Sequence, residues 1–302
     1  MSWLYREQYC LFMVRLKKGR EARGVFDRAL QCLPITQHDA IWSHYINWAR
    51  DYGVLETAIA VFKRFLMYDP SQREDFITYL EEKEQFEEAA KQLIICLEDE
   101  KFISMTGRSK HELWMHLCDI ISTHPFEMIR AIKVEPIIRS GIARFSDEVG
   151  RLWCRLADFY IRLGEFEKAR DIFEEAIHVV ITVRDFSVVF DAYLKFEESV
   201  LTAKMQAEED EEEISFDLAR LEFLVEKRPF LLNSVVLRQN PNNVFEWMKR
   251  VKLYKNDLKQ VVLTYMEALK TVDYSKCSGK LSSLWLGLAH CYEKHGDIDN
   301  AR

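Results

Sequence analysis

The chain has 302 residues, of which 48% are hydrophobic and 13% aromatic, and a formal net charge of −7 at pH 7. This is ample material for a large core, while only 10 glycines and 6 prolines disfavour an all-β fold with its many turns. The acidic balance argues against a protein whose main task is to coat nucleic acid, because each phosphate contact needs a cation. Local basic strips remain compatible with this balance.

The cysteines indicate the redox compartment of the protein, and the hydropathy pattern indicates whether it enters a membrane. The seven cysteines are odd in number and form no Cys-x-x-Cys pair, and no Asn-x-Ser/Thr acceptor occurs, which indicates a reducing, intracellular compartment. The apolar run around Cys10 has no small-residue cleavage site after it, so we interpret it as the first helix and not as a signal peptide. No uncharged apolar run approaches the roughly 18 residues that span a bilayer, and no membrane contact is expected.

The most regular feature of the chain is a tryptophan followed sixteen positions later by an alanine that opens a second apolar stripe. Apolar residues four and seven positions after the alanine share its helix face. Ser or Thr capping signals at positions 36, 71, 109, 146 and 182 are 35 to 38 residues apart, a period typical of two helices and two turns. The pairs are Trp42 with Ala58, Trp153 with Ala169, and Trp285 with Ala301.

This register predicts one array over residues 1–302, with about seven helical hairpins and an incomplete last one. In the fourth hairpin Pro136 stands where the repeat alanine is expected, so the second helix should be shifted. In the sixth, residues 207–214 form an acidic insert that should stay solvated, and residues 229–242 a long inter-repeat connection packed on the array. Because the chain stops where the last second helix would begin, we expect a longer protein. The hairpins are predicted at about 3–30, 37–67, 72–99, 110–145, 148–181, 183–228, 243–272 and from 281.

Two of the second-helix segments resemble the half-a-TPR (HAT) repeat. They read Ala22-Arg23-x-x-Phe26 and Ala169-Arg170-x-x-Phe173, each after a first helix rich in aromatic residues. The resemblance implies an all-α, right-handed superhelical solenoid of HAT/TPR-like antiparallel helix hairpins, and an RNA-processing assembly as its setting. We expect the arginines that follow the repeat alanines to make contacts within and between hairpins.

The segments between the helices are similar to those of pre-mRNA-splicing factors of the Syf family, and this similarity spans essentially the whole chain. It implies a nuclear, non-catalytic scaffold of the spliceosome, with components of the NineTeen complex and the intron-binding complex as partners. A further implied role is transcription-coupled DNA repair, with repair and transcription factors as partners. Arg6 departs from the pattern, because a first-helix tryptophan is expected there. The similar segments are 33–38, 151–158, 182–186 and 231–241.

Candidate chemistry is sparse. His111 and His116 are five residues apart, which separates their rings by about 140° on a helix, unlike the shared face of a zinc-binding His-Glu-x-x-His. His290 and His295 are better explained as the end of a first repeat helix than as metal ligands. No nucleophile elbow, phosphate loop or Gly-x-Gly-x-x-Gly motif occurs, so we predict neither an enzyme nor a cofactor or metal site.

One basic cluster lies at the predicted turn of the first hairpin. It could meet RNA phosphate or an acidic partner, or form an ordinary solvated turn. The aromatic residues are spaced as core and not as an exposed platform for stacking bases. The cluster consists of Arg15, Lys17, Lys18, Arg20 and Arg23.

The sequence therefore predicts an array that binds other proteins and performs no chemistry. Two alternatives stay open: a direct RNA-binding surface at the first turn, and a HAT scaffold of another RNA-processing complex, such as one for 3′-end cleavage or ribosome assembly. The residues expected to form the repeat core are Trp42, Tyr45, Trp48, Ala58, Phe62, Trp114, Trp153, Ala169, Phe173 and Trp285.

Overall fold

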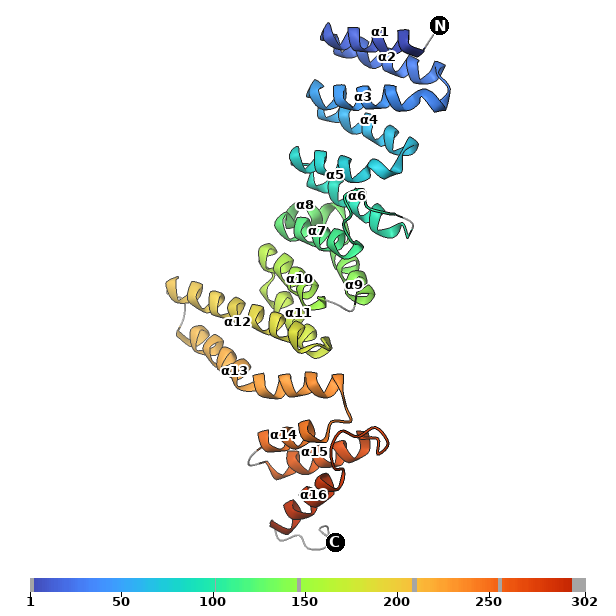
Figure 1. The fold of residues 1–302 in the computed structure, drawn as a ribbon. Helices are drawn as coiled ribbons and strands as arrows, with labels where there is room; N and C mark the ends of the chain where they lie inside the picture. Colours follow the sequence, from blue (N-terminus) through green and yellow to red (C-terminus); the bar gives the residue numbers. More distant parts are fainter. Residues whose placement is uncertain (1–2, 101, 146–147, 208–210, 255–256, 295–302) are drawn as a thin grey trace. The chain divides into compact units, whose positions relative to one another are not determined.

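The computed structural model describes residues 3–100, 102–145, 148–207, 211–254 and 257–294 (Figure 1). Within these ranges the chain forms sixteen α-helices and two short 3-10 helices, and no strand beyond an isolated bridge between Asn243 and Ser278. The all-α prediction is confirmed. None of the described helices is long and apolar enough to cross a membrane.

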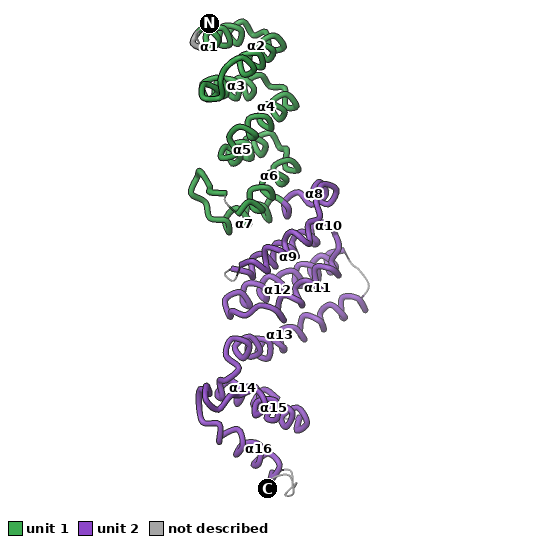
Figure 2. Tube along the Cα trace, turned by 90° about the vertical axis from the view of Figure 1, so that its right-hand side faces the viewer, with its two compact units in different colours: residues 1–120 green, residues 121–302 purple. Residues whose placement is uncertain are grey.

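The chain divides into two compact units, residues 1–120 and 121–302 (Figure 2). In the first unit each hairpin packs its two helices together, and α2 packs on α3. The last turn of α7 belongs to the second unit. The helices are α1 (Trp3–Arg15), α2 (Gly19–Cys32), α3 (His38–Tyr52), α4 (Leu55–Tyr68), α5 (Arg73–Glu82), α6 (Phe86–Glu98) and α7 (Lys110–Thr123), with 3-10 helices at Ile35–Gln37 and Pro70–Gln72.

In the second unit α10 packs on α11, α12 on α13, and α14 on α15, while α10 also packs on α12 and α13 on α14. Successive hairpins of this unit are therefore neighbours in space as well as in sequence. The helices are α8 (Pro125–Ala131), α9 (Val134–Arg144), α10 (Val149–Leu163), α11 (Phe166–Val179), α12 (Val183–Gln206), α13 (Glu211–Gln239), α14 (Val244–Leu253), α15 (Leu258–Thr271) and α16 (Ser282–Lys294).

The turns inside four hairpins share one backbone feature. The residue two positions before the second helix has a positive φ, between 55° and 80°. A left-handed residue there ends the first helix and reverses the chain, which glycine does without steric cost. The four residues are Lys17, Gly53, Glu84 and Gly164.

Of the five predicted caps, two are present and two are not, while Ser146 lies outside the described residues. Ser109 Oγ accepts the Glu112 N–H at 3.2 Å and the Glu112 carboxylate accepts the Ser109 N–H at 2.8 Å, a complete capping box. Thr182 Oγ1 accepts the N–H of Asp185 at 3.0 Å and caps α12. At the other two positions the residue lies inside a short 3-10 helix and caps no α-helix: Thr36 and Ser71.

The fourth predicted hairpin is instead three helices, α7, α8 and α9. Pro136 is the third residue of α9. The N–H groups of a first turn have no intrahelical partner, so proline is tolerated there and does not prevent the helix. The sequence predicts an irregular second helix in this hairpin, but it does not predict the extra short helix at 125–131.

In the predicted connection at 229–242, Val235 and Leu237 are buried as expected, but most of the segment is helix and not a connection. Helix α13 continues through Pro229 to Gln239, so only residues 240–243 connect it to α14. Of the predicted acidic insert, 207–214, residues 208–210 lie outside the described part, and Glu211 begins α13. Three acidic residues suit that first turn, because the positive end of the helix dipole stabilises them.

Candidate protein-interaction surfaces

At three junctions of the described chain, the joint between neighbouring hairpins is a stacked pair of aromatic rings. In each case a phenylalanine of the second helix faces a tyrosine in the first helix of the next hairpin. Such a joint completes the core of one hairpin with a side chain of its neighbour. The pairs are Phe26–Tyr45 at 4.6 Å between ring centroids, Phe62–Tyr79 at 5.1 Å and Phe173–Tyr193 at 5.1 Å.

In two of these joints the residue after the phenylalanine accepts the tyrosine hydroxyl. The Tyr45 hydroxyl donates to Asp27 at 3.0 Å, and the Tyr193 hydroxyl to Glu174 at 3.5 Å. Burial, aided by nearby carboxylates, raises the pKa of both phenols well above the usual value. Both tyrosines therefore remain protonated donors at neutral pH and hold the joint by a hydrogen bond as well as by stacking.

Nine of the ten expected core residues are buried, but Trp285 is 59% exposed, and the expectation for it is wrong. Helix α16 packs through Leu284 and Leu288, and Trp285 lies on a different helix face. Its expected partner, Ala301, lies outside the described residues. The buried residues are Trp42, Tyr45, Trp48, Ala58, Phe62, Trp114, Trp153, Ala169 and Phe173.

The basic cluster lies where it was expected, around the turn between α1 and α2. Arg15, Lys17 and Arg20 are exposed and form no ion pair with a described residue. Lys18 forms an exposed ion pair of 3.2 Å with the glutamate three positions on, and Arg23 is half-buried on α2. Three cations are thus available to an anionic partner at this turn.

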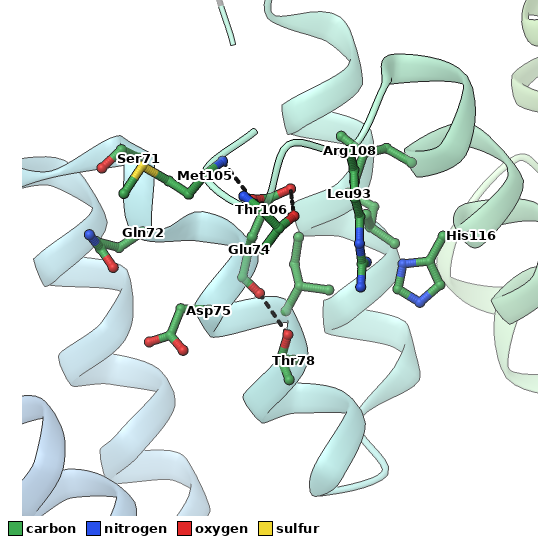
Figure 3. Close-up of a pocket in the computed structure, with 12 residues that line it drawn as sticks. Ser71, Gln72, Glu74, Asp75, Thr78, Leu93, Met105, Thr106, Arg108 and His116 are labelled. Carbon is green, nitrogen blue, oxygen red and sulfur yellow. Dashed lines mark hydrogen bonds between the residues drawn. The ribbon is translucent and has the colours of Figure 1, made fainter. Parts of the chain in front are cut away.

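A small cavity of about 160 Å³ lies among α5, α6, α7 and the loop between α6 and α7 (Figure 3). The buried Glu74 carboxylate holds this loop by accepting the N–H groups of Met105 at 2.9 Å and Thr106 at 3.2 Å. Arg108 and His116 line the cavity from the loop side and from α7. Cofactor pockets are typically about 300–1,000 Å³, so this cavity is smaller than a typical cofactor pocket.

His116, which was considered as a candidate metal ligand, contacts a single carboxylate. His116 Nε2 is 3.0 Å from a Glu81 carboxylate oxygen, a two-residue contact between α7 and α5. Among the described residues, no three His, Cys, Asp or Glu side chains come together as a metal would need. Burial raises the pKa of the Cys96 thiol to about 11 and that of Cys154 to about 12, so both stay protonated and poorly nucleophilic at neutral pH.

A cluster centred on Arg139 ties α9 to α10 and α11. Its guanidinium donates two hydrogen bonds to Glu175, at 2.7 and 2.8 Å, and one to Glu135 at 2.9 Å, and it lies 5.6 Å from the Trp153 ring centroid. The Tyr160 hydroxyl also donates to Glu135, at 3.0 Å. Hydrogen bonds from Arg139 lower the pKa of both glutamates, which favours their charged forms.

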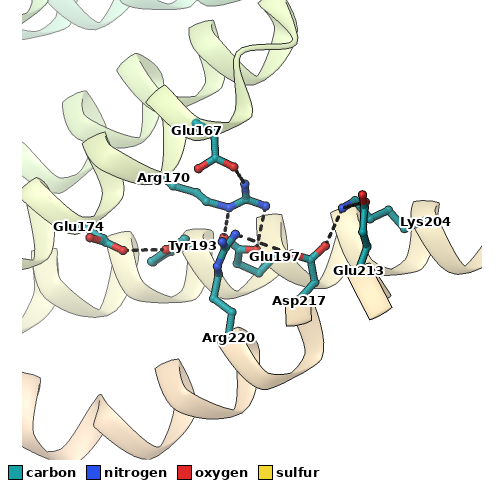
Figure 4. A network of polar contacts seen from close by, with 9 residues as sticks. All are labelled: Glu167, Arg170, Glu174, Tyr193, Glu197, Lys204, Glu213, Asp217 and Arg220. Atoms are coloured by element: carbon teal, nitrogen blue, oxygen red, sulfur yellow. Dashed lines mark hydrogen bonds and ion pairs between the residues drawn. The ribbon is translucent and has the colours of Figure 1, made fainter. Parts of the chain in front are cut away.

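A second charged network joins α11, α12 and α13 (Figure 4). Arg170 donates to Glu197 at 2.8 Å, and both side chains are buried, so the expected contact of Arg170 between hairpins is confirmed. Lys204 of α12 lies 3.0 Å from the buried Asp217 of α13, and Arg220 lies 3.7 Å from the same carboxylate. Ion pairs therefore hold α12 to α11 and α13 to α12, in the part of the hairpin where α12 ends and α13 begins.

Paired antiparallel helices joined by a repeated ring contact define a helical repeat protein, whose extended surface serves for binding. The model for the middle HAT repeat of pre-mRNA-splicing factor SYF1 matches residues 73–272, and that for the Syf1/CNRKL1 N-terminal HAT repeat matches residues 3–71. The chain belongs to the Syf1 family of HAT-repeat pre-mRNA-splicing factors, as its resemblance predicted.

Relatives from distant organisms match almost the whole chain. Pre-mRNA-splicing factor SYF1 of Homo sapiens is 46% identical over 99% of this chain and 35% of its own length. The syf1 homolog of Drosophila melanogaster is 45% identical over 97% of this chain and 34% of its own length. SYF1 of Dictyostelium discoideum is 43% identical, with 98% and 36% covered. The chain thus spans about a third of the length of these relatives.

Proposed function

We propose that this chain is a non-catalytic protein-interaction scaffold acting in pre-mRNA splicing, within the nucleus. The observation that carries the proposal is the repeated aromatic joint, combined with HAT repeats of a splicing-factor family over residues 3–71 and 73–272. Stacked helical hairpins of this kind offer many small docking sites along their surface. The partners that the family resemblance implies are proteins of the NineTeen complex and the intron-binding complex.

Affinity purification of the full-length protein from nuclear extract, followed by mass spectrometry, tests this function. We expect spliceosomal proteins to co-purify, and those that dock around α11 and α12 to be lost when the joint between these helices is broken by Phe173→Ala. Recovery of repair and transcription factors in the same experiment, after DNA damage, would support the second proposed role in transcription-coupled repair. A purification that yields components of a 3′-end or ribosome-assembly machine, and no spliceosomal protein, would overturn the proposal.

RNA contact at the first hairpin turn is a second candidate function. It rests on the three exposed cations Arg15, Lys17 and Arg20, which form no ion pair with a described residue. Because phosphate binding releases counterions, affinity for a single-stranded RNA should fall as salt rises, and replacing all three by glutamate should abolish it. Absence of measurable binding near 50 mM salt would eliminate this candidate.

A further inference from the structure

The α12–α13 pair is the longest hairpin that the structure describes. Its helices have 24 and 29 residues, against 15 and 14 for α10 and α11 (Figure 1). The hydrogen bonds and ring contacts between α13 and α14 involve only the second half of α13. Asn233 donates to the backbone of Glu246 at 3.0 Å, and the Phe230 ring lies 4.8 Å from the Tyr254 ring. The first half, residues 211–228, extends away from these contacts.

This first half of α13 exposes apolar side chains that a solvated helix would not carry. Phe216 and Phe223 are 63% and 60% exposed, and Leu218 and Val225 are 45% and 52% exposed. Each pair is seven residues apart, so each forms a stripe along the helix. The inner face is occupied, because the buried Asp217 points toward Lys204 of α12.

Between the two apolar stripes lies an acidic row. Glu222 and Glu226 are exposed, form no ion pair with a described residue, and lie about 40° apart on the helix. The three cations of this segment are already engaged. Arg220 pairs with Asp217, Lys227 lies over the Phe223 ring at 5.2 Å, and Arg228 pairs with Asp191 at 3.4 Å. The uncompensated charge of the outer face is therefore negative.

We infer that the outer face of α13 over residues 211–228 binds a basic amphipathic helix of a partner protein. Lysine or arginine side chains of that helix would pair with Glu222 and Glu226, and its apolar side chains would cover the neighbouring stripe of Phe216 and Phe223. Ala219, exposed in line with the acidic row, leaves room for the partner backbone to approach. Charge complementarity selects a basic protein segment over RNA, whose phosphates this face would repel.

The charged network described above makes this surface rigid before binding. Lys204 holds Asp217 from α12, and the buried Arg170–Glu197 pair holds α12 against α11. A helix that is already fixed loses little conformational entropy when a partner docks. The inference rests on the proposed function only in assuming that the array is a scaffold.

Fluorescence anisotropy of the full chain with a labelled Leu/Lys amphipathic peptide of about 18 residues, the length of 211–228, tests the inference. We expect binding that weakens by roughly tenfold or more in Phe216→Ser/Phe223→Ser and in Glu222→Lys/Glu226→Lys. The charge-reversed protein should instead prefer a Leu/Glu peptide. Matched controls are Phe126→Ser and Glu56→Lys, which change an exposed phenylalanine and an exposed glutamate elsewhere and should leave binding unchanged.

Equal peptide affinity in the wild-type and both double variants would overturn the inference, as would loss of binding in the controls to the same degree. Binding of a labelled oligouridine that depends on Phe216 and Phe223 would also overturn it. Affinity purification of the full-length wild-type and Glu222→Lys/Glu226→Lys proteins distinguishes a failure of this inference from a failure of the proposed scaffold function. If splicing proteins co-purify with wild type while the peptide binds all variants equally, only the surface assignment fails.

Discussion

At the residue scale, the left-handed position in each hairpin turn is the simplest point at which sequence controls stability. Glycine occupies it in two turns, whereas Lys17 and Glu84 adopt the same conformation with a side chain. A left-handed conformation costs a non-glycine residue about 1–2 kcal/mol. Part of this disadvantage is offset, because glycine loses more conformational entropy on folding than other residues do. The turns are thus not equally favourable, although their geometry is the same.

Glu84→Gly should therefore stabilise the protein by about 0.5–1 kcal/mol, because the exposed Glu84 side chain makes no ion pair with a described residue. Gly164→Ala should destabilise it by about 1 kcal/mol. A Cβ at Gly164 would meet no atom within 4 Å, so the backbone angle alone sets the cost. Urea unfolding measures both changes. A stabilising Gly164→Ala would refute this account of the turns.

The buried Arg170–Glu197 pair makes a second prediction at this scale. Glu197→Ala should cost about 3–5 kcal/mol, because it leaves the buried Arg170 without its main partner. The double variant Arg170→Met/Glu197→Met should recover most of that loss, since it removes both charges and keeps the volume. Thermal unfolding of Arg170→Met, Glu197→Met and the double variant gives the coupling energy. Additive losses would contradict a mutually dependent pair.

At the scale of elements, most helices are predictable because their apolar stripes repeat at helical spacing and because short turns force antiparallel pairs. The prediction is wrong at α13. Proline usually marks a helix end, and Pro229 leaves the carbonyl of Val225 without its helical hydrogen bond. Val225 is largely exposed, so water can satisfy that carbonyl and the helix continues.

The interaction surfaces are less predictable than the core. Core residues can be predicted from their helical spacing, and nine of the ten predicted ones are buried. Trp285 shares that spacing, but its burial depends on a second helix whose expected residues lie outside the described part. Glu197 is 27 residues from Arg170, and no local pattern connects them. Such long-range pairs become visible only when the hairpins are packed together.

The Arg139 cluster predicts how the packing of α9 on α11 depends on pH. The pKa values of Glu135 and Glu175 are lowered in the folded protein, so both bind protons more weakly there than in the unfolded chain. Their contribution is present above the unfolded value of about 4.5 and is lost as pH falls through the folded values. The urea midpoint of the wild type should decline more steeply below pH 5 than that of Arg139→Met. Parallel declines would show that this cluster contributes nothing to acid sensitivity.

At the scale of the whole molecule, each hairpin depends on its neighbours and not on a single central core. The joints link consecutive hairpins, and the two compact units each contain their own. In such a chain the free energy of unfolding is close to a sum over hairpins and their interfaces. Damage to one joint should therefore stay local, and this separates a repeat array from a globule of the same size.

Trp153→Ala tests this locality. Trp153 is buried in α10 beneath Arg139, and its removal should cost about 3–5 kcal/mol. Hydrogen exchange followed by mass spectrometry should show lost protection in α9, α10 and α11, while α1 to α6 remain protected. Trp285→Ala is the matched control, because that exposed tryptophan should cost far less and leave the exchange pattern unchanged. If Trp153→Ala instead lowered protection evenly along the chain, folding would be globally cooperative, and a damaged hairpin would disable every docking surface at once.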